Sequence, residues 1–268
     1  MKIPIIDLQN QKTGEKVLPA QFNEAYRPDL IERAVHALQS RSRQPYGAHP
    51  EAGKRHSAKL SRRRRDYKGA YGMGISRVPR KTLNRRGTRF YWVGAVAPNT
   101  TGGRRSHPPK AEKIWEQMIN KKENRKAIRS ALAASLDKQI VSQRGHKVPD
   151  TYPFIISADV EKLAKTGEIS DLLKRLNLAE ELSRSLIKKI RSGIGKLRGR
   201  KYQKKKGLLI VVGNECPLLK SAMNIPGVDV VQANQLNAEL LAPGKMPGRI
   251  SLFTENAIKE IEEKKLFV

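Results

Sequence analysis

The side chains with the clearest chemical capacity in this sequence are arginines and lysines, and most of their excess lies in two stretches. Residues 41–110 contain 19 Lys and Arg against two acids, and residues 188–206 contain ten and no acid. The remaining chain has 25 basic and 23 acidic residues, so the formal charge of +29 belongs to these two stretches. Guanidinium and ammonium groups at this density attract polyanions, and arginine can donate paired hydrogen bonds to a phosphate.

Aromatic rings and glycines are interleaved with the basic residues of the first stretch. Tyr67, Tyr71 and residues 90–92 (Phe-Tyr-Trp) supply the rings, and arginine outnumbers lysine. This composition favours RNA or DNA over a solvated surface, because arginine and aromatic side chains stack on bases. For residues 90–93, packing against a folded domain and stacking on bases are both open.

Residues with catalytic or metal-binding potential do not form a recognisable pattern. The five histidines and Cys216 lack metal-ligand spacing. The glycines Gly193, Gly195 and Gly199 resemble a dinucleotide loop, but the third is one residue late and the loop follows an expected helix. We therefore expect no metal site, no cofactor and no enzymatic activity. An RNA-modifying or RNA-cleaving enzyme is the alternative, with only an α/β fold to support it.

The whole-chain properties indicate a cytoplasmic protein. A single cysteine excludes an internal disulfide and fits a reducing compartment. We find neither a signal segment at the N-terminus nor an apolar run of about 18 residues, so no membrane span is expected.

The hydrophobic pattern predicts one α/β domain made of residues 1–40 and 111–268, with a basic internal loop at residues 41–110. Continuous apolar runs at 153–157, 208–212, 228–231 and 250–253 are typical of strands buried on both faces. Their alternation with helices predicts a mainly parallel, Rossmann-like sheet flanked by helices. Residues 3–8 and 16–22 are expected to form a strand pair.

Helical spacing of apolar residues predicts several helices. These are a helix from Pro28 to Gln39, one over 110–120, one over 124–136, two short ones separated at Gly167, one over 179–191, and one over 255–264 behind a Thr254 cap. Exposed ion pairs are expected on the helices, namely Glu161 with Lys165, Asp171 with Arg175, and Glu180 with Arg184.

Four segments resemble a known protein family. Residues 43–55 (RQPYGAHPEAGKR), 77–80 (RVPR) and 102–110 (GGRRSHPPK) resemble the archaeal and eukaryotic branch of the universal large-subunit ribosomal protein L4 family. The segment Arg191–Tyr202 is similar to a second signature of that family. The chain lacks the long C-terminal extension typical of eukaryotic members, which favours an archaeal protein.

The resemblance implies a structural protein of the large ribosomal subunit whose internal loop enters the rRNA and aids assembly. Its implied partners are large-subunit rRNA, neighbouring ribosomal proteins and the nascent peptide, with Mg²⁺ only as bound by the rRNA, and no homo-oligomer is implied. The loop tip that lines the peptide exit tunnel maps to Tyr71, Gly72, Met73 and Gly74. The residues expected to contact rRNA are Arg43, Lys54, Arg55, Arg62, Arg63, Arg64, Arg65, Lys68, Arg77, Arg80, Lys81, Arg85, Arg86, Arg104, Arg105, Arg191, Lys196, Arg198, Arg200 and Lys201.

The basic loop is also expected to be disordered away from its partner. Its cations repel one another, and it has too few apolar residues to form a core of its own.

Overall fold

The computed structural model describes all 268 residues, which divide by their internal contacts into two units. We call Met1–Ser42 together with Glu116–Val268 the body, and Arg43–Trp115 the insert. In the body, the two chain segments that flank the insert are joined to each other. Arg41 Nε lies 2.9 Å from Glu116 Oε1, and Gln117 N donates to Ser40 Oγ over 2.9 Å.

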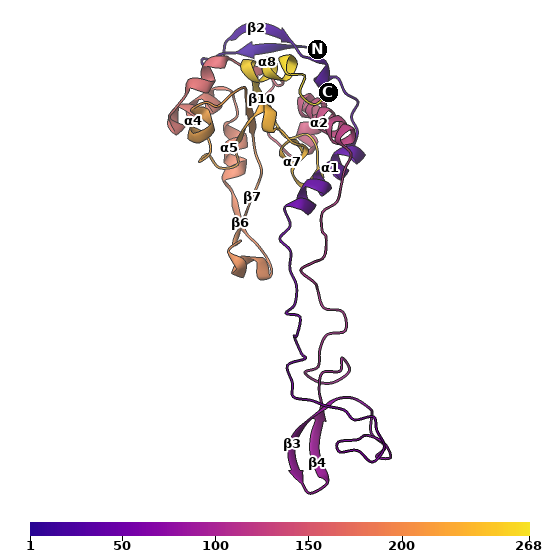
Figure 1. Ribbon diagram of the computed structural model, residues 1–268. Helices are drawn as coiled ribbons and strands as arrows, with labels where there is room; N and C mark the ends of the chain where they lie inside the picture. The colour runs from indigo at the N-terminus through magenta and orange to yellow at the C-terminus, as the bar shows by residue number, and fades with distance from the viewer. The chain divides into compact units, whose positions relative to one another are not determined.

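A six-stranded sheet in the order β2-β1-β5-β10-β8-β9 forms the centre of the body (Figure 1). Neighbouring strands are parallel except for β1 and β2, which are antiparallel. The expected mainly parallel α/β fold is therefore confirmed. The strands are β1 (Lys2–Ile6), β2 (Lys12–Val17), β5 (Ile155–Ile156), β8 (Leu209–Val212), β9 (Asp229–Gln232) and β10 (Ser251–Thr254).

Helices cover both faces of this sheet because the side chains of its central strands alternate between two apolar clusters. Leu209 and Val211 of β8 pack in one cluster with α1, α2, α7 and α8, whereas Ile210 and Val212 pack in the other with α4 and α6. The helices are α1 (Pro28–Arg41), α2 (Lys121–Leu136), α3 (Lys138–Gln143), α4 (Thr166–Arg175), α5 (Ala179–Leu186), α6 (Leu218–Ser221), α7 (Ala238–Leu241) and α8 (Glu255–Glu263). Neither cluster contains a residue of the insert.

Local sequence signals set the ends of two of these helices. Pro28 occupies the first turn of α1, where its missing N–H costs no hydrogen bond. Thr254 caps α8 by accepting a hydrogen bond from Ala257 N over 3.2 Å, as the sequence predicts.

Two predicted helices are wrong. Residues 110–120 contain no helix, and Ile114 and Met118 are 85% and 84% exposed, so their helical spacing has no apolar surface to pack against. The helix over 179–191 ends at Leu186, and Lys188–Ile190 instead forms a strand. Two boundaries also shift. Gly167 lies inside α4 rather than ending a helix, and β2 occupies Lys12–Val17 rather than 16–22.

None of the three predicted helix ion pairs forms. Lys174, one position before Arg175, pairs with Asp171, and Glu181 rather than Glu180 pairs with Arg184. Glu161 is buried and forms no ion pair. It accepts hydrogen bonds from Gly213 N, Thr254 Oγ1 and Asn256 Nδ2 over 3.1, 2.6 and 2.9 Å. The prediction for Glu161 failed because opposite charges four residues apart pair on exposed helix faces, whereas Glu161 is buried.

Glu181 is the centre of a buried polar cluster. Its carboxylate is 1% exposed and accepts hydrogen bonds from Arg184 Nε (2.8 Å), His146 Nδ1 (2.7 Å) and Lys147 N (3.0 Å). Burial alone would raise the pKa of Glu181, but these donors outweigh it and hold the pKa at about 2. Burial lowers the pKa of His146, so a neutral imidazole donates its Nδ1–H to Glu181.

Replacing Glu181 by Gln should reduce the stability of the protein and weaken its acid sensitivity. Because the folded-state pKa lies below the ordinary value of 4.5, the stabilisation is complete above that value and is lost as pH falls toward about 2. The loss is on the order of 3 kcal/mol. Urea unfolding of wild type and Glu181→Gln between pH 7 and pH 2.5 measures it. Glu180→Gln, at the exposed neighbouring position, is the control. Equal pH dependence in all three proteins would contradict the assignment.

Candidate nucleic-acid interface

The insert contains a β-hairpin that the sequence analysis did not predict. Strands β3 (Arg80–Arg86) and β4 (Arg89–Gly94) pair antiparallel, with Arg86 opposite Arg89. Gly87 begins the two-residue turn with φ of +57°, and hairpin turns of this length require positive φ. Arg85, Arg86 and Arg89 are exposed and flank the turn that joins β3 and β4.

Three aromatic rings pack beside this hairpin. The ring centroids of Phe90 and Trp92 are 5.1 Å apart and nearly parallel, and Tyr67 meets Phe90 edge-on at 5.2 Å. Arg85 Nη1 donates to the Tyr67 hydroxyl over 2.5 Å. The two alternatives for residues 90–93 were packing on the body and stacking on bases. In the structure Phe90 and Trp92 pack on one another within the insert, and stacking of residues 90–93 on bases stays a prediction.

Two glycines permit close contact between the outgoing and returning chains of the insert. A Cβ at Gly47 would lie 2.4 Å from Ala111 N, and one at Gly53 would lie 2.6 Å from Arg104 Cα. Ala48 N donates to Pro109 O over 2.9 Å beside this contact. The glycines in the segment 43–55 therefore have a structural reason, because any side chain would separate the two chains.

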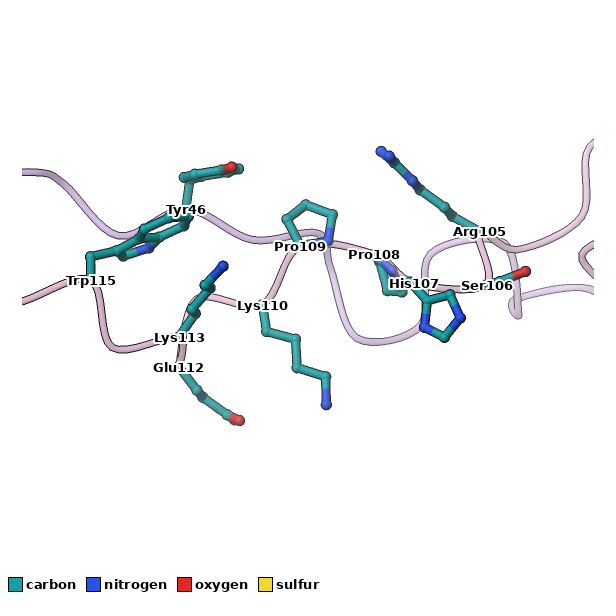
Figure 2. Close-up of a pocket in the computed structure, with 10 residues that line it drawn as sticks. All are labelled: Tyr46, Arg105, Ser106, His107, Pro108, Pro109, Lys110, Glu112, Lys113 and Trp115. Atoms are coloured by element: carbon teal, nitrogen blue, oxygen red, sulfur yellow. The ribbon is translucent and has the colours of Figure 1, made fainter.

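A stacked group of side chains lies beside the same two chains. Figure 2 shows the rings of Tyr46 and Trp115, which are 5.6 Å apart with an interplanar angle of 17°. The Arg43 guanidinium lies 3.7 Å from the centroid of the Trp115 ring. These rings border a hollow of about 740 Å³ that Arg105, Lys110 and Lys113 also line. Trp115 was expected to pack in a helix, but it stacks here instead. Its indole Nε1 is buried and has no hydrogen-bond partner in the protein.

The cations of the insert lack acidic partners. The insert holds 19 Lys and Arg, and none of them forms an ion pair with its three acids, Glu51, Asp66 and Glu112. Asp66 instead accepts a hydrogen bond from the Ser61 hydroxyl, which with the Tyr67 N–H lowers the pKa of Asp66. The positive charge of the insert is thus available to an external anion.

Most of the expected contact residues in the insert are exposed, and Arg80 is the main exception. The exposed ones are Arg43, Lys54, Arg55, Arg62, Arg63, Arg64, Arg65, Arg77, Arg85, Arg86 and Arg105, whereas Lys68, Lys81 and Arg104 are half-buried. Arg80 is buried, and its guanidinium donates to Ser76 O and Val78 O over 2.5 and 3.3 Å. These two hydrogen bonds from the Arg80 side chain hold residues 76–78, which precede β3, in place.

The segment expected to form the loop tip is exposed. Tyr71, Met73 and Ile75 are 40%, 57% and 36% exposed, and Gly72 and Gly74 have φ of +75° and +64°. Arg77 lies over the Tyr71 ring at 4.3 Å.

The second basic stretch forms a separate hairpin on the body. Strands β6 (Lys188–Ile190) and β7 (Tyr202–Lys204) pair antiparallel and flank a 3₁₀ helix, Ile194–Arg198 (Figure 1). Gly193 and Gly199 border this helix with φ of +76° each. Four predicted residues, Lys196, Arg198, Arg200 and Lys201, are exposed together at the end of this hairpin, and Arg191 beside them is half-buried.

Three further cations of these surfaces belong to the basic stretches found in the sequence but not to the single residues expected to contact rRNA. Arg89 lies opposite Arg86, and an alternating pattern across the Gly87 turn could have revealed it. Lys189 and Lys204 lie in β6 and β7, where the over-long helix prediction concealed the pairing.

No helix combines the length and apolarity that crossing a membrane requires. No group of three His, Cys, Asp or Glu side chains is arranged to hold a metal ion.

The parallel sheet, the basic insert and the basic hairpin define an α/β protein with two cationic surfaces. Comparison with known proteins gives a more specific result. The model of the ribosomal protein L4/L1 family matches residues 16–264. The large ribosomal subunit protein uL4 of Nanoarchaeum equitans is 49% identical over 100% of both chains. The uL4 proteins of Archaeoglobus fulgidus and Methanococcus maripaludis are 41% and 44% identical over at least 97% of each chain.

The chain belongs to the ribosomal protein L4/L1 family. This confirms the resemblance seen in the sequence, and the archaeal relatives agree with the expected archaeal branch. Proteins of this family are structural rather than enzymatic, which confirms the expectation that the chain is not an enzyme.

In the free protein, the backbone amides of β3 and β4 should exchange with solvent much faster than those of β8. An isolated two-stranded hairpin is marginally stable in water, and Leu83 and Val93 are 67% and 43% exposed, whereas β8 is fully buried. Hydrogen exchange followed by mass spectrometry would measure both segments in one sample. Addition of large-subunit rRNA should slow exchange in β3–β4. Protection of β3–β4 equal to that of β8 without RNA would contradict this prediction.

Proposed function

We propose that this protein is a structural constituent of the large ribosomal subunit that binds large-subunit rRNA through the insert and the β6–β7 hairpin. The observation that carries the proposal is the set of insert cations that form no ion pair within the protein. Phosphate groups of rRNA would neutralise these cations, and the release of counterions would supply much of the binding free energy. Binding along two separate surfaces would help the subunit to assemble.

The role proposed for the insert is to enter the rRNA, with residues 71–74 lining the exit tunnel for the nascent peptide. The exposed Tyr71 and Met73 support this placement, because side chains that line a passage must be free to face it, and Gly72 and Gly74 adopt the positive φ that a turn between them needs. Neighbouring large-subunit proteins are the other proposed partners. The protein would work in the cytoplasm as part of the ribosome, as one copy per subunit.

No cofactor is part of this proposal. Mg²⁺ would be present only where it is bound by rRNA phosphates, because the cationic surfaces of the protein repel it.

Removal of residues 44–107 should leave a folded body with greatly weakened rRNA affinity. The body should fold because neither apolar cluster includes an insert residue. Each neutralised phosphate adds about 0.7–0.9 to the magnitude of the log–log salt slope, so the deletion should flatten that slope by several units. Salt-dependent binding to large-subunit rRNA, in competition with bulk tRNA, would measure both effects. Unchanged affinity and slope in a folded deletion variant would refute the proposal.

A charge variant of the full chain separates the insert's charge from its length. Arg85, Arg86 and Arg89 would be replaced by Gln together. The matched control replaces Arg175, Lys220 and Lys259, three exposed body cations without ion pairs, and so removes equal charge. The insert variant should lose about 10-fold or more in affinity and about two units of salt slope. An equal loss in the control would show that total charge alone determines binding.

A further inference from the structure

The two outer strands of the six-stranded sheet, β2 and β9, differ in how their free edges are protected. β2 carries three charged side chains, and its pairing with β1 is interrupted by a register shift between Ile5 and Ile6. Charged side chains and irregular pairing are common means by which an edge strand avoids adding another chain. β9 pairs with β8 without a register shift, and Asp229 is its only charged residue. The outer edge of β9 therefore lacks the protections of β2.

Backbone groups on the outer edge of β9 have no partner in the protein. Asp229 N donates to Leu208 O over 3.0 Å, so Asp229 and, by alternation, Val231 face β8, whereas Val230 and Gln232 face away from it. β9 is last in the sheet order, and no hydrogen bond to Val230 N, Val230 O or Gln232 N forms elsewhere. Because an extended peptide presents donors and acceptors in the same alternation, these groups favour a protein strand over RNA.

Apolar side chains lie on both faces of this edge. Val230 packs at the margin of one apolar cluster and Val231 at the margin of the other, and both are half-buried. A strand added beside β9 would cover more of both valines, and apolar residues on its two faces would extend both clusters. The segment that fits this edge is thus apolar on both faces.

An apolar pocket of about 270 Å³ lies beside the chain that leads into β9. Leu182 and Leu186 of α5 line it together with Ile225 and Pro226 of that chain, and Leu186 is 61% exposed. The only charged residue of the lining, Lys174, is neutralised by an acid one turn before it in α4. The pocket therefore offers no free cation to a phosphate and suits an aliphatic side chain.

A second copy of this chain is a poor occupant for the edge of β9. Each copy has a formal charge of +29, and repulsion between two such chains opposes their association. β9 is only four residues long, so the few hydrogen bonds of a β9–β9 pair could not offset this repulsion. The occupant is therefore a different protein.

We propose that β9 is a docking edge for an extended apolar segment of another protein of the large subunit. The segment would add as a further strand and place an aliphatic side chain in the pocket beside α5. In this mode of recognition, main-chain hydrogen bonds supply affinity and the side-chain pocket supplies selectivity. The choice of a large-subunit protein rests on the proposed function, whereas the edge and its chemistry do not.

A synthetic peptide tests the edge on the full chain in solution. The probe is a short run of valine, isoleucine and leucine between solubilising serine and glutamate ends. Residue-resolved hydrogen exchange by NMR should show rapid exchange of the Val230 and Gln232 amides in the free protein. Saturation with peptide should slow both by about 10-fold or more, whereas the Val231 amide, bonded to β8, should be slow throughout. Unchanged exchange at Val230 and Gln232 with millimolar peptide would overturn the proposal.

Two variants separate the backbone edge from the pocket. Val230→Pro removes an outward N–H and is compatible with an edge strand. Its control is Val17→Pro on the outer edge of β2, because Leu18 N donates to Met1 O and Val17 thus faces away from β1. Leu186→Ser tests the pocket. Its control is Ile187→Ser, at a position that is 59% exposed and outside the pocket.

Val230→Pro and Leu186→Ser should each weaken peptide binding by about fivefold or more, and neither control should change it. Thermal unfolding verifies that each variant is folded, and the exposed Leu186 keeps the test informative if Val230→Pro destabilises the sheet. Wild-type affinity in a folded Leu186→Ser variant, or an equal loss in the controls, would contradict the docking model.

Photocrosslinking in assembled large subunits identifies the occupant. A benzophenone amino acid would replace Gln232, and in a control chain it would replace the exposed Glu15 of β2. A crosslink from position 232 to another large-subunit protein, lost when Val230→Pro is added, would support the proposal. A crosslink to RNA or to a second copy, or none in an assembled subunit, would overturn it. Failure of the wild-type chain to enter the subunit would instead refute the proposed function and the choice of occupant, and the peptide experiment would still decide on the edge.

Discussion

Repulsion among the cations of the insert is the constraint on which the rest of the structure depends. The 19 Lys and Arg of this segment form no ion pair within the protein, so no internal contact offsets their mutual repulsion. The body does not depend on the insert for its hydrophobic core. Its two apolar clusters are complete without the insert, and outside residues 188–206 its basic and acidic residues are almost balanced. Stability and the proposed polyanion binding are therefore assigned to different parts of one chain, and a change in one need not weaken the other.

Two charged side chains that are buried inside the body, unlike the cations of the insert, have partners of opposite charge. Arg249 is 1% exposed and donates to Gly207 O, Leu208 O and Leu240 O as well as to Asp229. Glu181 likewise has a donor for each of its oxygens. Arg249 and Glu181 are thus both paired with an opposite charge and hydrogen-bonded, which offsets the cost of their desolvation.

Helices and strands were predicted correctly where their signal lies within a few residues. The predictions failed where contacts with distant parts of the chain determine the structure. The continuous apolar runs of β8 and β10 predicted strands covered on both faces, and Thr254 predicted the start of α8, because both signals lie within a few residues. Residues 110–120 have helical spacing but no apolar surface to meet it, so Ile114 and Met118 are exposed. The site shows the same division. The density of arginine identified both cationic surfaces, whereas the stacking of Trp115 on Tyr46 joins two segments far apart in the sequence and has no local signal.

The joined ends of the insert also have a topological meaning. Arg41 with Glu116, and Ser40 with Gln117, tie the two ends together, so the insert is a closed loop of chain rather than a free tail. A free tail can be drawn through a finished ring of RNA by its end. A closed loop can pass only with both of its chains together, and here it must also carry the β3–β4 hairpin. If RNA surrounds the insert, as the proposed function has it, that RNA would have to be open still when the protein arrives, which would link the protein's binding to the order in which the RNA folds.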